Sequence, residues 1–206
     1  MQKYLFWPVL IFLAIGWVYP IIGVLALFVA PIPPLFAMTR GRYWCGNYCP
    51  NGSMYEQIAG KFSKHRPIPK IFTNIYFRIT VLIVFISIFA WRLSAVWGNW
   101  PDVGKLLIIM ITAGSVTFII AGMLLHERLW CAICPFGTMG KLVNPTPQVR
   151  VYVKNSCDNC GKCDTVCPLN IAPSKYKGNP EGITDADCMK CTHCQKACPL
   201  NAIEIK

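Results

Sequence analysis

The chain has 206 residues, of which 54% are hydrophobic and 14% are charged, and its net charge is +11. Because soluble domains carry about a quarter charged residues, this composition excludes intrinsic disorder and argues against an ordinary soluble globule. Residues 150–206 hold eight basic and six acidic side chains, too small an excess for a nucleic-acid surface, so no nucleic-acid partner is expected.

Three apolar stretches are long enough to cross a membrane. They cover residues 4–30, 71–91 and 106–125, and a helical span needs about 20 apolar residues. Pro20 interrupts the first stretch, for which we expect one kinked span. Two half-spans that turn between Gly16 and Pro20 are the alternative within residues 4–36. The second stretch contains Arg78, whose charged end we expect to extend to the membrane surface.

The loop between the first two stretches is basic. Residues 38–71 hold six Lys and Arg side chains against the single acid Glu56. Because Lys and Arg gather on the cytoplasmic side, we expect a multi-pass protein of the cytoplasmic (inner) membrane. Three spans then place the N-terminus outside and the tail inside. His126 and Glu127, at the inner end of the third stretch, are either a headgroup contact or a proton-transferring pair.

A cysteine motif follows the first and the third stretch, with the pattern R-x-W-C-x(2–3)-C-P-x-G-[ST]-M. Two spans separate the copies, so both face the same side. The four cysteines of these motifs, which we call the motif cysteines, are Cys45, Cys49, Cys131 and Cys134. They could hold a metal or a cluster, and so form a third redox or metal site beside two in the tail that are described below. They could instead act as two redox-active dithiols or remain structural thiols.

Neighbouring residues of the motifs carry two further expectations. Arg42 and Arg128 suit contact with lipid headgroups. Ser53 and Glu56 have the spacing of a capping box, which predicts a short helix along the membrane surface over about residues 54–62.

The composition changes after residue 143, where apolar runs give way to Cys, Asn, Asp, Lys and Pro. Residues 1–143 are predicted to form an α-helical membrane domain of about three spans. Residues 144–206 are predicted to form a separate small domain, beginning with a short linker at 144–147. Such a short segment cannot bury a large apolar core, so it needs another source of stability.

The tail contains an internal repeat, whose first copy begins at Cys157 and whose second copy begins at Cys188. Both copies read C-x2-C-x2-C-x3-C-P, the run that binds [4Fe–4S] clusters in bacterial two-cluster ferredoxins, where the fourth cysteine ligates the other cluster. The pattern predicts one cluster on Cys157, Cys160, Cys163 and Cys198. It predicts a second on Cys188, Cys191, Cys194 and Cys167. Residues 144–206 are therefore predicted to form a small α+β, bacterial two-cluster ferredoxin-like domain. His193 lies inside the second copy, and we expect a surface residue near the cluster rather than a ligand.

Taken together, the paired R-x-W-C motifs and the two-cluster tail resemble a family of membrane iron–sulfur proteins. This family includes the quinol dehydrogenase membrane subunit of periplasmic nitrate reductase systems. It also includes the C-terminal half of the nitrous oxide reductase regulator and a cytochrome oxidase assembly protein. The resemblance implies electron transfer between the quinone pool and a redox protein partner.

The leading hypothesis is therefore a membrane-anchored iron–sulfur electron-transfer protein, with the lipid bilayer, a quinone and a redox protein as partners. Whether it is an enzyme, as a subunit of a quinol dehydrogenase, is left open. One alternative is reduction or delivery of a metal such as copper by the motif cysteines during cofactor assembly. Another is a redox sensor or regulator, in which the clusters signal rather than conduct.

Overall fold

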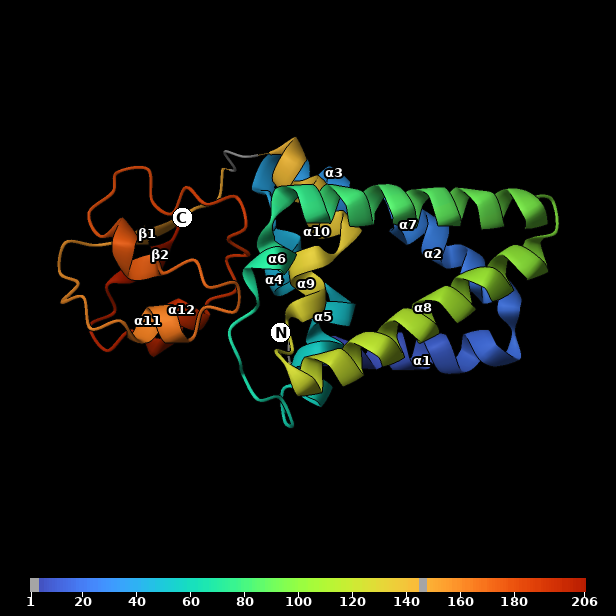
Figure 1. The fold of residues 1–206 in the computed structure, drawn as a ribbon, viewed down its shortest axis with the longest axis horizontal. Coiled ribbons are helices and arrows are strands. Elements are labelled where there is room, and N and C mark those ends of the chain that lie inside the picture. Colours follow the sequence, from blue (N-terminus) through green and yellow to red (C-terminus); the bar gives the residue numbers. More distant parts are fainter. Residues whose placement is uncertain (1–3, 145–147) are drawn as a thin grey trace.

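The computed structural model describes residues 4–144 and 148–206, so most of the predicted linker, residues 145–147, lies outside the described residues. Residues 4–144, which we call the helical part, contain long apolar helices and several short ones. Residues 148–206 form a lobe at one end of the long helices, which we call the tail (Figure 1). The described chain is mostly helical.

The first apolar stretch forms two helical runs of opposite direction. Helix α1, Phe6–Val18, ends before Tyr19, whose φ of −122° and ψ of 84° are not helical. Pro20 accounts for this break, because proline disfavours the helical conformation in the residue before it. The chain then returns through η2 Pro20–Val24, α2 Leu25–Val29 and α3 Ile32–Arg40. The expected single span is therefore wrong, and the turn lies where the alternative placed it.

This turn changes where the chain begins. Val9 packs against Met54 and Tyr55, which lie at the end of the first cysteine motif. The start of α1 therefore lies at the same end of the helices as the motifs and the tail (Figure 1). The sequence placed the N-terminal end on the opposite side from the tail. In the structure the start of α1 lies at the tail end of the long helices, because the first stretch forms two antiparallel helical runs rather than one.

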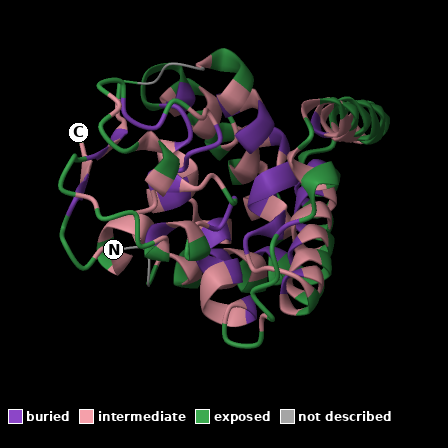
Figure 2. Cartoon of the chain, turned by 60° about the vertical axis from the view of Figure 1, so that its left-hand side comes forward, coloured by how far each residue is buried: buried purple, intermediate pink, exposed green. Residues whose placement is uncertain are grey.

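Two long helices follow. Helix α7, Ile75–Val96, begins after Asn74, whose side chain accepts a hydrogen bond from the Tyr76 amide at 2.9 Å. Helix α8, Trp100–Leu124, returns toward the motifs. Three helical runs are long and apolar enough to cross a membrane: Pro20–Arg40, Ile75–Val96 and Trp100–Leu124. Figure 2 shows that buried residues gather near the junction with the tail, whereas long helices remain largely uncovered.

Glycines bring the first hairpin against α8. A Cβ atom on Gly23 would overlap the Gly104 carbonyl oxygen, and one on Gly104 would overlap the Pro20 carbonyl oxygen. Small residues permit this backbone approach, which is a common way for apolar helices to pack. The turn at Pro20 thus packs against the beginning of α8, at the end of the helix that lies away from the tail.

The helical part has a twofold internal organisation, in which a hairpin of apolar helices is followed by short motif helices. The first copy has α4 Tyr43–Asn47, α5 Pro50–Met54 and the π-helical segment η3 Tyr55–Ala59. The second has α9 Leu129–Ile133 and α10 Pro135–Val143. The short helix α6, Lys70–Thr73, leads into α7. In each copy, proline occupies the first position of the helix after the second cysteine, where a missing N–H costs nothing.

The predicted capping box is wrong. Cys49 caps α5, and its sulfur accepts a hydrogen bond from the Gly52 amide at 3.4 Å. Ser53 is fully buried inside this helix, and Glu56 forms ion pairs with residues distant in sequence. The residues predicted to start a surface helix therefore help to form the interior of the motif region.

Strands contribute little to the tail. Within the described ranges, β1 Val151–Val153 pairs antiparallel with β2 Ile203–Ile205, and Tyr152 lies opposite Glu204. The helical turns are α11 Lys162–Thr165, η4 Pro173–Tyr176 and α12 His193–Ala197. The expected α+β domain is thus a loop-rich lobe closed by one two-stranded sheet that joins its first and last segments.

Candidate functional site

The two tail motifs adopt the same backbone, which extends the sequence repeat into three dimensions. Helices α11 and α12 begin at equivalent positions of the two copies, directly before the third cysteine of each. Left-handed φ values recur at equivalent positions in three pairs, which are Asn159 and Lys190, Gly161 and Thr192, and Asn170 and Asn201. Such values are uncommon outside glycine, so their recurrence shows that both copies wind their cysteines around the same kind of tight loop.

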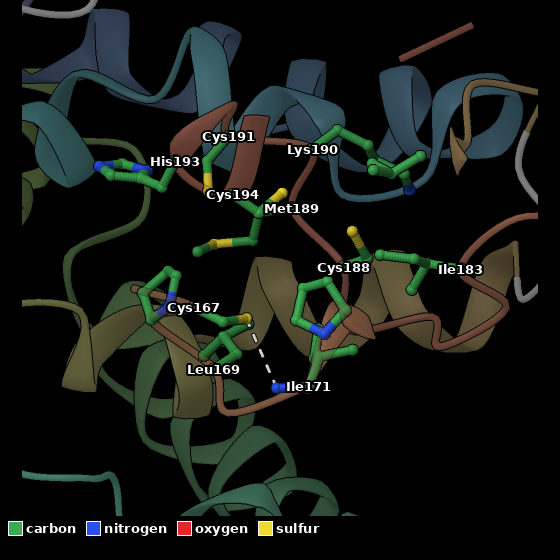
Figure 3. Close-up of a pocket in the computed structure, with 13 residues that line it drawn as sticks. Cys167, Leu169, Ile171, Ile183, Cys188, Met189, Lys190, Cys191, His193 and Cys194 are labelled. Atoms are coloured by element: carbon green, nitrogen blue, oxygen red, sulfur yellow. Dashed lines mark hydrogen bonds between the residues drawn. The ribbon is translucent and has the colours of Figure 1, made fainter. Parts of the chain in front are cut away.

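Four tail cysteines surround one cavity, shown in Figure 3. Its lining includes the predicted second set, Cys167, Cys188, Cys191 and Cys194. The Ile171 amide donates to the Cys167 sulfur at 3.4 Å, and the equivalent Ala202 amide donates to the Cys198 sulfur at 3.3 Å. Hydrogen bonds to ligand sulfurs tune cluster potentials. Cavity, sulfur donors and amide N–H groups therefore fit a cluster in this set.

Three members of the first predicted set border the apolar core of the tail. Cys163 is buried there, and Cys157 and Cys198 pack against the same core. Cys160 is exposed on the loop before α11. The structure thus places one predicted set deep against the helical part and the other toward the outer face of the tail.

A loop of the tail, residues 187–193, is docked onto the helical part, and we call it the docked loop. Asp187 accepts hydrogen bonds from Arg42 Nη1 at 2.7 Å, Arg78 Nη1 at 2.6 Å and Lys141 Nζ at 2.6 Å. Arg42 and Arg78 are each only 1% exposed. Neither reaches a lipid headgroup, so the expectations of a headgroup contact for Arg42 and a surface-seeking Arg78 are wrong.

A second ion-pair group holds the other end of the docked loop. Glu56 pairs with Arg128, and its other oxygen lies 3.0 Å from His193 Nε2. Burial alone would raise the pKa of Glu56, but the His193 hydrogen bond and the Arg128 charge lower this pKa to about 2. Arg128 is 1% exposed, which also corrects its predicted headgroup role. His193 is half-buried and bridges the two parts.

Backbone contacts complete the docking. The Asn47 side chain donates to the Lys190 carbonyl oxygen at 3.1 Å. A Cβ atom on Gly46 would overlap the Met189 carbonyl oxygen. Only a glycine leaves room for this approach, so the docked loop lies directly on α4, beside Cys45.

Each motif arginine reaches across to the other motif copy. Arg42 donates to the Cys131 carbonyl oxygen, while Arg128 Nη1 lies 3.5 Å from the Cys45 carbonyl oxygen and 3.9 Å from the Cys131 sulfur. The motif glycines leave space for these guanidiniums, Gly52 beside Arg128 and Gly137 beside Arg42. The arginine, cysteine and glycine of the motif therefore form one reciprocal arrangement.

The motif cysteines come together at this crossing. Cys131 is buried, and Cys45, Cys49 and Cys134 are half-buried. Burial raises the pKa of Cys49 and Cys134, that of Cys134 to about 12. Within residues 4–144 and 148–206, no three His, Cys, Asp or Glu side chains converge on a position for a single metal ion.

His126 and Glu127 lie beside this crossing. Glu127 is 3.1 Å from His65 Nδ1 and 3.5 Å from His126 Nδ1, and the Arg128 amide donates to His126 Nδ1 at 3.1 Å. Burial lowers the pKa of His126. The pair thus orders the start of the second motif, and His65 joins it from the basic loop.

Comparisons with known proteins agree with the cysteine patterns. The model of a 4Fe-4S dicluster domain matches residues 150–199, and that of a 4Fe-4S binding domain matches residues 21–69 and 107–151. The chain contains 4Fe-4S ferredoxin-type domains. The second model spans both R-x-W-C motifs, and the first spans the tail motifs.

Three relatives are distant. Over 68 residues the chain is 38% identical to the methylamine utilization ferredoxin-type protein MauN of Paracoccus denitrificans, covering 30% of this chain and 24% of MauN. It is 24% identical over 172 residues to the uncharacterized protein MJ0750 of Methanocaldococcus jannaschii, covering 75% of this chain and 70% of that protein. MJ0749 of the same organism is 24% identical over 165 residues, covering 75% and 63%. No solved structure matches the chain.

Proposed function

We propose that the protein is a membrane-anchored electron-transfer protein that exchanges electrons between the quinone pool and a redox protein partner. When bound, its [4Fe–4S] clusters supply one-electron chemistry. The observation that carries this proposal is the docked loop, whose cysteines Cys188 and Cys191 lie between two ion-pair groups that fix the tail to the helical part. This attachment gives the predicted second set a constant place near the ends of the apolar helices.

The composition of the helices supports the anchoring. Each of the three candidate spans has a mean hydropathy of at least 2.2, and at most 22% of its most apolar window is buried inside the protein. Such uncovered apolar surface, in three helices at once, is typical of lipid contact. The basic loop after α3 favours a cytoplasmic location for the motif end and the tail.

A cleft between the two parts supports access for a small carrier. Its volume is about 780 Å³, within the usual range for ligand sites. Apolar residues from the loop before α6 and from the tail line it, together with Arg42, Arg78 and Asp187. Leu169 also lines the cleft and lies two residues after the predicted ligand Cys167. Asp187 lines it too and directly precedes the predicted ligand Cys188. A quinone ring in this cleft would lie beside the predicted second set.

The opposite set supports a protein partner. Cys160 and its neighbours on the loop before α11 are exposed, and the apolar side chain of Leu200, two residues after Cys198 of the same set, is 50% exposed. Exposed apolar side chains near a redox centre suit a transient contact with another protein. We therefore place the redox partner on this outer face.

Reconstitution in liposomes tests the quinone step. A menaquinol or ubiquinol analogue should reduce the wild-type protein anaerobically. The reduction is measured as a loss of visible absorbance and the appearance of EPR signals. Thr73→Trp fills the cleft and should abolish reduction by quinol while leaving reduction by dithionite intact. Ile83→Trp, at a 59% exposed position on α7, is the matched control and should behave as wild type. A wild-type protein that stays oxidised with quinols of every midpoint potential refutes the quinone step.

A further inference from the structure

The motif cysteines share one buried region although they come from two distant segments. Cys45 packs against the buried Cys131 in the same apolar core. Cys49 lies close enough to Cys45, Cys131 and Cys134 for their charges to act on its ionisation. The two copies thus direct four sulfur atoms to one place, beneath the docked loop.

Positive charge is in excess around this region. Five cationic side chains gather here, four of them at most 3% exposed: Arg42, Arg78, Arg128, Lys190 and the half-buried Lys141. The carboxylates paired with them, among the described residues, are Asp187 and Glu56. Removing charged groups from water is costly unless opposite charge compensates them, so three positive charges require an anion that the carboxylates do not supply.

Several of these cations also have unused donors. Arg42 Nε, Arg128 Nε and Lys190 Nζ are buried and have no hydrogen-bond partner within the described part of the chain. A buried donor without an acceptor costs about 1–3 kcal/mol. Arg42 lies in electrostatic contact with Cys45 and Cys131, and Lys190 with Cys45 and Cys188. The missing negative charge is therefore needed at the sulfur atoms.

We propose that the four motif cysteines together hold a third [4Fe–4S] cluster, with the arginine of each motif as its counter-charge. Four thiolates around such a cluster carry net negative charge and accept N–H groups at sulfur, which is what the surrounding cations lack. The iron–sulfur class is supported by the 4Fe-4S binding domain that matches both motif segments. Met189 and Cys191 of the docked loop belong to the same core as Cys45 and Cys131, so this centre adjoins the predicted second set.

This inference rests on the proposed function only in treating the protein as an electron carrier. It requires neither a quinone nor a protein partner. Counting iron therefore separates its failure from failure of the quinone step, which the liposome assay measures.

Iron and acid-labile sulfide counts on the anaerobically purified full-length protein test the site. Wild type should bind roughly twelve iron atoms per chain, four for each cluster. The double variant Cys45→Ser/Cys134→Ser should bind roughly eight and retain both tail EPR signals. Cys160→Ser, the matched control in the tail, should lose a tail signal and retain the third centre.

Roughly eight irons in wild type, unchanged in the double variant, would overturn the proposal. So would stoichiometric copper or zinc that disappears with the motif cysteines, because it would assign the site to a single metal. If the double variant fails to fold, the iron count of the wild type and its number of reducible centres still decide whether a third cluster is present.

A potential measurement tests the counter-charge role of Arg128. Arg128→Met removes a buried positive charge beside the cluster and should lower the midpoint potential of the third centre, because adding an electron there becomes less favourable. Arg128→Lys keeps the positive charge and should change the midpoint potential of the third centre less. The signal of the first predicted set, on the outer face of the tail, should keep its potential in both variants. Equal potentials in Arg128→Met and wild type would refute this role.

Discussion

Asp187 offers the sharpest test of how the tail is held. Asp187→Asn keeps the size of the side chain and removes the single charge that pairs with Arg42, Arg78 and Lys141 at 2.6–2.7 Å. Two of these partners are 1% exposed, so water cannot replace the lost carboxylate. Breaking a buried pair by removing one partner costs about 3–5 kcal/mol. The docked loop should therefore open roughly 150- to 5,000-fold more often.

Hydrogen–deuterium exchange in the full-length protein measures this opening. Amides of the docked loop should exchange faster in Asp187→Asn, whereas the amides that pair β1 with β2 should keep their protection. Glu181→Gln removes the same charge from an exposed side chain of the tail and should leave both regions unchanged. Equal protection of the docked loop in wild type and Asp187→Asn would show that the three ion pairs do not hold it, and would refute the reasoning.

Three further predictions concern packing, pH and clusters. Gly104→Ala should lower the midpoint of thermal unfolding in detergent, because the added Cβ atom would overlap the Pro20 carbonyl oxygen. Gly114→Ala is the control and should leave the midpoint unchanged, because a Cβ atom there has nothing within 4 Å. Equal midpoints for the two variants would contradict this packing. The Glu56 pKa falls from 4.5 to about 2, so its contribution of roughly 3 kcal/mol to docking is complete above pH 4.5 and lost toward pH 2; exchange corrected for intrinsic rate should show docking that weakens as the pH falls below 4.5, and unchanged docking down to pH 3 contradicts it. Removing iron with a chelator should abolish protection of the β1–β2 amides while α8 stays helical, since bound metal supplies folding energy in small domains; a protected sheet in the iron-free protein would show that the tail folds unaided.

Local patterns in the sequence predicted the features that depend on near neighbours. The repeated C-x2-C-x2-C-x3-C-P run predicted the cysteine loops of the tail, and the structure winds both copies alike, down to left-handed residues such as Gly161 and Thr192. Apolar runs predicted α7 and α8 with bounds shifted by a few residues: α7 begins and ends later than the expected 71–91, and α8 begins earlier than the expected 106–125. Pro20 marked the break in the first stretch, but whether the chain continues or reverses there depends on glycine contacts with α8, which no local pattern shows.

The arginines were misjudged for a different reason. A basic residue beside an apolar run usually contacts lipid headgroups, and the alternative requires a buried partner elsewhere in the chain. For Arg42 and Arg78 that partner is Asp187, which is 145 and 109 residues away. One local signal was available, because the glycine that recurs in C-P-x-G indicates a position without space for a side chain. The structure shows that Gly52 and Gly137 make room for the arginines.

The crossed arginines also bear on how such a chain can be built. Arg42 supports the backbone of Cys131, and Arg128 supports that of Cys45, so neither half of the helical part completes its own sulfur pair. A polypeptide with a single hairpin and motif would lack the guanidinium that braces its cysteine. Two such polypeptides, paired about a twofold axis, would each provide what the other lacks. In the present chain one polypeptide contains both halves, so each motif finds the arginine of the other within the same molecule.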